Sequence, residues 1–161
     1  MRLKVYIETT IVSYLTARPS HDLIMAANQK ITREWWAGPR HAYDLYISQF
    51  VLDEAGDGDP DAAQRRLAAL ECLPLLDVTP ATMAIAEEIV RRRLLPSRAA
   101  TDAYHLSVAA AGRMDFLLTW NCNHLANAEL YRPIAALLRD RGIEPPQVCV
   151  PSELMGMGPK E

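Results

Sequence analysis

The chain has 161 residues, of which 50% are hydrophobic and 23% are charged. A chain of this length and composition is expected to build a core of its own, without stabilising disulfides. The three cysteines are odd in number and show no close-paired spacing, which favours reduced thiols in the cytoplasm. No apolar run approaches the roughly 20 residues that a membrane-spanning helix needs, and the first residues look like a strand, so neither a membrane anchor nor a secretory signal is predicted.

The net charge of −3 does not indicate a dedicated binder of duplex nucleic acid. Such proteins usually carry a basic excess that neutralises phosphates. Basic residues do gather in two segments, one from Lys30 to Arg40 and one from Arg91 to Arg98. For each segment taken alone, a solvated helix face is the preferred interpretation.

Five short runs of apolar residues predict buried strands. Each run is almost continuously apolar, as expected for strands covered on both faces, whereas a half-exposed strand would alternate. The runs are Leu3–Ile7, Leu45–Ser48, Pro74–Val78, Phe116–Thr119 and Val148–Val150.

Longer stretches with helical spacing of apolar residues separate these runs. Proline favours the first helical position and glycine the position after the last, so both mark helix ends here. One helix is predicted to face the core with a stripe of Met83, Ala86, Val90 and Leu94. The predicted helices are His21–Trp36, Pro60–Leu70, one opened by Thr79 or Pro80, Ser97–Ala111 with Ser97 as its N-cap, and Pro133–Arg141.

Strands that alternate with helices predict parallel pairing through right-handed crossovers. The expected fold is α/β, a three-layer α/β/α sandwich around a mainly parallel sheet of about five strands. No interdomain linker is recognisable, so residues 1–155 are expected to form a single domain, followed by a short C-terminal tail at 156–161.

Three acidic residues lie where an apolar run ends or a helix begins: Glu8, Glu54 and Asp102. A polar cluster at 119–124, which contains Asn121, closes another apolar run. In open α/β sheets, ligands bind beyond the carboxyl ends of the strands, near the point where strand order reverses. Carboxylates at that edge can hold a hard divalent cation, because such cations take oxygen ligands. Spacing alone does not establish that these residues converge.

Four motifs occur in a fixed order along the chain, and they are specific only in combination. They are Tyr6-Ile7-Glu8-Thr9-Thr10, the segment Ser48–Glu54, Thr101-Asp102-Ala103-Tyr104-His105-Leu106, and Leu117-Leu118-Thr119-Trp120-Asn121. With them the chain resembles, from Val5 to about Glu153, the PIN-domain family of metal-dependent ribonucleases. Within that family it is most similar to the VapC-type toxins of bacterial toxin–antitoxin pairs.

The resemblance implies an enzyme that hydrolyses RNA phosphodiester bonds with Mg²⁺ or Mn²⁺. By position in the motifs, Glu8, Glu54 and Asp102 are the implied metal ligands. Thr10 is the implied polar support of the first acid, and Asn121 occupies the fourth acidic position. The resemblance also implies an RNA substrate, a cognate antitoxin protein as partner, and a homodimer.

Two positions depart from the commonest pattern of the family. Glu8 stands where an aspartate is usual, and its extra methylene moves the carboxylate by roughly one bond length, to which an octahedral Mg²⁺ site is sensitive. Asn121 removes one negative charge from the fourth position, so a second metal should bind more weakly. One firmly bound metal is therefore expected at most. The alternative function is a catalytically weakened PIN-like module that binds RNA or protein.

Each candidate also has a purely structural interpretation. Glu8 can form an ion pair or cap the next helix, and Asp102 can stabilise a helix N-terminus through the helix dipole. His105 lies one helical turn after Asp102 and is interpreted as a hydrogen-bonded helix histidine, with metal ligation as the alternative. For Asn121, organisation of the turn after the strand and a functional role both stay open.

Overall fold

A computed structural model describes residues 1–156 of the chain. Within that part, four strands form one sheet in which every pair is parallel, in the order β2-β1-β3-β4. The predicted α/β class with a parallel sheet is confirmed. The strands are β1 (Lys4–Ile7), β2 (Asp44–Tyr46), β3 (Phe116–Leu118) and β4 (Gln147–Cys149).

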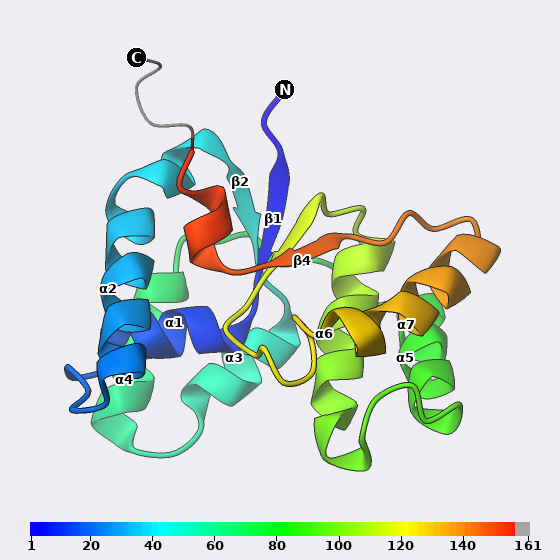
Figure 1. Cartoon of the computed structure of the whole chain (residues 1–161), viewed down its shortest axis with the longest axis horizontal. Helices are drawn as coiled ribbons and strands as arrows, with labels where there is room; N and C mark the ends of the chain where they lie inside the picture. Colours follow the sequence, from blue (N-terminus) through cyan, green and yellow to red (C-terminus); the bar gives the residue numbers. More distant parts are fainter. Residues whose placement is uncertain (157–161) are drawn as a thin grey trace.

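Helices lie on both sides of this sheet. Figure 1 shows α1 to α4 on one side and α5 to α7 on the other. The helices are α1 (Thr9–Thr16), α2 (Leu23–Ala37), α3 (Gln49–Gly56), α4 (Pro60–Leu70), α5 (Pro80–Arg91), α6 (Ala100–Ala111) and α7 (Ala128–Asp140), with short 3₁₀ turns η1 (Pro39–Ala42), η2 (Ser97–Ala99) and η3 (Pro151–Leu154).

Local sequence signals begin most of these helices. The side chains of Asp22, Asp59, Thr79 and Asn127 accept hydrogen bonds from backbone N–H groups in the first turns of α2, α4, α5 and α7. Such caps satisfy N–H groups that have no partner inside the helix. Proline is the first residue of both α4 and α5, as predicted.

The two central strands are the most deeply buried elements. Val5, Tyr6 and Ile7 of β1 are fully buried, and so are Leu117 and Leu118 of β3. Helices cover both faces of these strands, which explains why their sequences are continuously apolar. The residues that follow β1 and β3 therefore lie at the edge of a rigid, well-packed core.

The predicted strand over Pro74–Val78 is wrong. Only an isolated parallel bridge joins Leu75 to Ile47, through hydrogen bonds from the Ile47 N–H to the Pro74 carbonyl (3.0 Å) and from the Leu76 N–H to the Ile47 carbonyl (2.8 Å). Leu75 is 51% exposed, because the segment runs along the edge of the sheet and is not covered on both sides. The sheet therefore has four strands, not about five.

The predicted core stripe of α5 is also wrong in most positions. Of its four residues only Ala86 is fully buried, whereas Val90 is exposed and Leu94 lies beyond the end of the helix. A polar residue, Thr82, takes a core position instead, and its hydroxyl shares a hydrogen bond with that of Thr79 (3.0 Å). The buried face consists of Thr82, Ile85, Ala86 and Ile89.

Two helix starts differ from prediction. Ser97 begins the 3₁₀ turn η2, and α6 starts at Ala100 without a side-chain cap. The last helix, α7, starts at Ala128 and contains Pro133, because Asn127 caps it further upstream. Pro133 is the sixth residue of α7, where its missing N–H removes the helical hydrogen bond to the Glu129 carbonyl.

Among the described residues, no helix is both long and apolar enough to cross a membrane. The three cysteines are free, with Cys149 buried and Cys72 and Cys122 exposed. Apart from Gly156, the predicted tail at 156–161 lies outside the described residues.

Candidate metal centre

The order of the strands sets the position of the candidate site. The chain places β2 on one side of β1 and later places β3 on the other side, so strand order reverses between β1 and β3. Ligands of open α/β sheets bind at the carboxyl edge next to such a point. Glu8 directly follows β1 and Thr119 directly follows β3, so both lie at this edge.

Three side chains converge there: Glu8, Glu54 and His105. Their possible ligand atoms all lie within 4.8 Å of one another. Glu8 and His105 are buried, and Glu54 is partly exposed. Three separate elements deliver them, because Glu8 ends β1, Glu54 lies on α3 and His105 lies on α6. Two of the three predicted ligands thus come together, and His105 joins them.

Glu8 is 4% exposed and is held by two threonines. Its Oε2 accepts hydrogen bonds from the backbone N–H of Thr10 (3.1 Å), from the Thr10 hydroxyl and from the Thr119 hydroxyl (2.7 Å). Burial raises the pKa of Glu8, although the positive charge of His105 and these hydrogen bonds act to lower it. Glu8 also caps α1, so its structural interpretation as a helix cap is confirmed.

Glu54 and His105 form a hydrogen-bonded pair. The Oε1 of Glu54 contacts His105 Nε2 and accepts a hydrogen bond from the Thr9 hydroxyl (2.7 Å). Burial alone would raise the pKa of Glu54, but the bond to His105, its positive charge and the bond from Thr9 outweigh burial and lower it. The carboxylate of Glu54 is therefore held in its charged form.

A second contact fixes the ring of His105. Its Nδ1 lies 2.8 Å from the hydroxyl of Tyr6, which in turn lies 2.7 Å from the hydroxyl of Ser48. Burial alone would lower the pKa of His105, but the bond to Glu54 and the charges of Glu8, Glu54 and Asp102 outweigh burial and raise it. The predicted role of His105 as a hydrogen-bonded helix histidine is confirmed.

Asp102 lies beside this group without belonging to it. Its Oδ2 accepts a hydrogen bond from Asn121 Nδ2 (3.0 Å) and is paired with His124 Nδ1 (3.1 Å). Burial raises the pKa of Asp102, while the bond to His124 and the charges of His105 and His124 act to lower it. Because His105 interacts electrostatically with Glu8, Glu54 and Asp102, the four residues form one coupled set of charges.

Asn121 has two roles in this arrangement. Its side-chain oxygen accepts a hydrogen bond from the His124 N–H (3.2 Å), which organises the turn after β3. Its amide nitrogen orients Asp102. The structural and functional interpretations of Asn121 are therefore compatible with one geometry.

Each of the three carboxylates uses a single oxygen for these contacts. The hydrogen bonds go to Glu8 Oε2, Glu54 Oε1 and Asp102 Oδ2. Among residues 1–156, no side-chain hydrogen bond reaches the other oxygen of any of them. Neighbours thus orient each carboxylate while one oxygen stays available, as in metal sites where outer residues position the ligands.

The donor atoms fit a hard divalent cation. Carboxylate oxygens suit Mg²⁺ and Mn²⁺, whereas imidazole nitrogen suits later transition metals. The group of Glu8, Glu54 and His105 therefore fits a transition metal better than Mg²⁺. A site of Glu8, Glu54 and Asp102, as predicted from the motifs, would contain oxygen donors only and would accept either ion.

Sequence reasoning did not identify several residues of this centre. Thr9, Thr119 and His124 orient carboxylates, and Tyr6 fixes His105. Each lies within or next to one of the four motifs, so proximity to a motif was the available signal.

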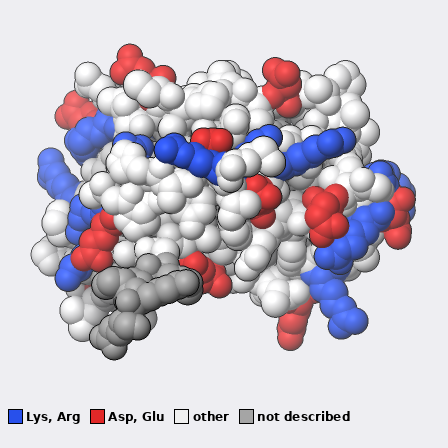
Figure 2. Space-filling view, turned by 90° about the horizontal axis from the view of Figure 1, so that it is seen from above, with Lys and Arg blue, Asp and Glu red and all other residues white. Residues whose placement is uncertain are grey.

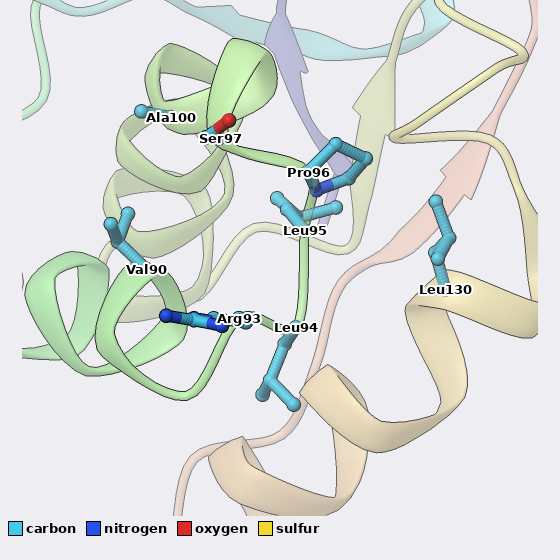
Figure 3. A pocket seen from close by; sticks show the side chains of 8 residues that line it. All are labelled: Val90, Arg93, Leu94, Leu95, Pro96, Ser97, Ala100 and Leu130. Atoms are coloured by element: carbon cyan, nitrogen blue, oxygen red, sulfur yellow. The ribbon is translucent and has the colours of Figure 1, made fainter.

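A cavity of about 610 Å³ lies between α5, α6 and α7 (Figure 3). Leu95, Pro96 and Leu130 are among its mostly apolar lining residues, with Arg93 as the charged one. None of the residues that line it belongs to the carboxylate and histidine group.

No protein-family model matches this chain, and no curated protein matches it either. The resemblance to PIN-domain ribonucleases therefore remains a prediction based on the four motifs.

Proposed function

We propose that this protein is a metal-dependent endoribonuclease of the PIN type, with a three-layer α/β/α fold, acting in the cytoplasm as the toxin of a toxin–antitoxin pair. The observation that carries the proposal is the convergence of Glu8, Glu54 and His105 beside Asp102 at the carboxyl edge of the parallel sheet. Burial raises the pKa of Glu8 and Asp102 in spite of their hydrogen bonds, so a cation bound beside them would offset the cost of their charged forms.

The proposed metal is Mn²⁺ or Mg²⁺, held by Glu8 and Glu54 together with Asp102, His105 or both. A cation bound there supplies a water of lowered pKa and neutralises charge that develops on the phosphate. The residues of the chain do the positioning: Thr10 and Thr119 hold the carboxylate of Glu8. Thr9 holds Glu54 in the same way.

The surface offers positive charge despite the acidic balance of the chain. Figure 2 views the side on which β1 begins and shows Lys and Arg side chains in a row across it. The carboxylates of the centre contribute to the net charge of −3 without lying on this side. This side lies opposite the carboxyl edge of the sheet that carries the centre, so this row of charge does not contribute to binding of an RNA phosphate at Glu8 and Glu54.

The second candidate function is a weakened PIN-like module that binds RNA or protein without cleavage. The amide of Asn121 occupies the position where the family has a fourth acid, and it already binds Asp102. Metal affinity separates the two functions, because the binding module needs no tightly held cation. The antitoxin partner and the homodimer are proposed from the family resemblance alone.

The test is cleavage of a mixed RNA pool by the purified chain with Mn²⁺ or Mg²⁺. Wild type is expected to cleave, and EDTA or Asp102→Asn is expected to abolish cleavage. Asp53→Asn is a matched control, because Asp53 is exposed and bonded to Gln49 beside the centre. Folded wild type that cleaves nothing, or Asp102→Asn that cleaves as fast, would refute the catalytic proposal.

A further inference from the structure

Two stacked pairs of aromatic rings adjoin the carboxylate centre. The rings of Tyr14 and Trp120 lie 5.8 Å apart at an interplanar angle of 12°. Those of Phe50 and Tyr104 lie 5.1 Å apart at 22°. All four side chains are only partly buried, whereas rings of the inner core, such as Trp35, are fully buried.

The first pair is fixed next to Glu8. The backbone N–H of Trp120 donates to the Thr10 hydroxyl (2.8 Å), which itself holds Glu8. The indole N–H of Trp120 donates to Thr32 on α2 (2.7 Å), which sets the ring orientation. Tyr14 lies on α1, the helix that Glu8 caps.

The second pair is fixed next to Glu54 and His105. Phe50 lies on α3, one turn before Glu54, and meets the ring of His105 edge-on at 6.4 Å and 77°. Tyr104 directly precedes His105 on α6. Tyr14 lies on α1 and Tyr104 on α6, and Figure 1 shows these two helices on either side of β1.

A single RNA strand that brings one of its phosphates to the carboxylates must place one base on each side of that phosphate. In a duplex both faces of each base are covered by neighbouring bases. RNA recognition by aromatic rings is therefore a property of unpaired segments, whose splayed bases stack on the side chains. Stacking tolerates any base sequence, because every base has a flat face.

We propose that the Tyr14–Trp120 and Phe50–Tyr104 stacks are subsites for the bases that flank the scissile phosphate. This inference rests on the proposed ribonuclease function for the identity of the polymer. Tyr104 and Trp120 act as substrate-binding residues, and the rings do not take part in the chemical step.

The experiment measures binding and cleavage separately. Binding of a fluorescent unpaired 10-nucleotide RNA, and of the same sequence paired in a duplex, is followed in EDTA so that metal-dependent cleavage cannot interfere. Cleavage of the unpaired RNA with Mn²⁺ gives KM and kcat. The variants are Tyr104→Leu and Trp120→Leu, with Tyr104→Phe to keep the ring. Trp36→Leu is the matched control, because Trp36 packs on Arg40 and Trp35, away from the centre.

Each leucine variant is expected to weaken binding of unpaired RNA by about 5- to 150-fold, the loss of one stacked base. KM should rise accordingly while kcat changes little, and Tyr104→Phe and Trp36→Leu should resemble wild type. Wild type should also bind an RNA with abasic nucleotides on both sides of the cleaved bond more weakly than the intact RNA. This measurement does not depend on the folding of any variant.

The inference is overturned if wild type binds the abasic RNA as tightly as the intact one, or the duplex as tightly as the unpaired strand. It is equally overturned if folded leucine variants bind like wild type. Failure of the proposed function has a different signature. Ring-dependent binding of unpaired RNA without any cleavage in Mn²⁺ would refute the nuclease and leave the subsites standing.

Discussion

At the residue level, the carboxylates of Glu8 and Glu54 lie close to the imidazole of His105, and Asp102 lies beside this group. His105 is 1% exposed, and the charges of Glu8, Glu54 and Asp102 all favour its positive form. Burial nevertheless raises the pKa of Glu8 and Asp102, which means that their charged forms are costly in the folded chain. Such costs are typical of functional sites, where charge needed for a ligand is kept at the expense of stability.

The substitution Glu8→Gln should separate stability from function. It removes a buried charge whose raised pKa makes it destabilising at neutral pH, and the side-chain oxygen of Gln can still accept the bonds from Thr10 and Thr119. Without added metal, the variant should unfold at a temperature equal to or above that of wild type, as calorimetry would show. A clearly lower Tm would mean that ionised Glu8 stabilises the fold and that the centre carries no such cost.

Thr119→Val tests the support of Glu8. The hydroxyl of Thr119 donates a hydrogen bond to Glu8 (2.7 Å) and accepts one from the backbone N–H of Asn121 (2.9 Å). Valine has the same shape as threonine but can make neither bond. Loss of such an outer contact typically costs about 10- to 100-fold in metal affinity or activity. Titration with Mn²⁺ should therefore show weaker binding in a folded variant, and unchanged affinity would exclude Thr119 from the support of the metal site.

At the level of elements, α6 matters most because it carries both Asp102 and His105. It packs against α5 along its length and ends at Ala111, followed by Gly112. A Cβ at Gly112 would lie 2.9 Å from a methyl carbon of Leu76 and 3.1 Å from the Val108 carbonyl. Glycine is needed there for the close approach of the Leu76 segment.

Gly112→Ala is therefore expected to destabilise the protein by about 1–3 kcal/mol, the usual cost of overpacking. Denaturant unfolding would measure this change. Gly56→Ala is the control, because an added Cβ would meet nothing closer than 3.9 Å and Gly56 lies within α3 without a positive φ. Equal unfolding midpoints for the two variants would show that the Leu76 side chain yields without cost.

The sequence predicted elements whose signals are local. Caps and prolines placed α4 and the start of α5 correctly, and continuous apolar runs located both central strands. Pro74–Val78 has a similar run, but its single bridge to Ile47 lies at an edge that only the assembled sheet defines. A run of apolar residues does not show whether a partner strand continues beside it.

The candidate centre could be predicted in part for the same reason. Glu8, Glu54 and Asp102 were found through motifs, yet the contact between His105 and Glu54 joins residues 51 positions apart. Only the packing of α6 against α3 determines that His105 faces Glu54 while Asp102 faces Asn121 and His124. Side-chain partners across elements depend on helix rotation, which the sequence pattern fixes only coarsely.

At the level of the whole molecule, a cation in the centre would link α3, α6 and the end of β1, since each delivers a ligand. These elements come from both sides of the sheet (Figure 1). A ligand that binds only the folded chain stabilises it by mass action. Metal binding should therefore be visible in global stability.

Mn²⁺ at a hundred times its dissociation constant is expected to stabilise the chain by about 2.7 kcal/mol. For a domain of this size that corresponds to a rise in Tm of about 5–10 °C. The rise should disappear with EDTA and be reduced in Glu54→Gln, whereas Asp53→Asn should keep it. A Tm that does not change when Mn²⁺ is added would favour the binding module.

The most direct measurement of the central claim is Mn²⁺-dependent cleavage of RNA by wild type and by Glu8→Gln, with the folding of both verified by their Tm. Wild type is predicted to cleave, and the folded variant is predicted to lose at least about a hundredfold in rate, because it misplaces the cation and its water. Cleavage at equal rates by both proteins, or by neither, would contradict the account of a metal-dependent ribonuclease built on Glu8.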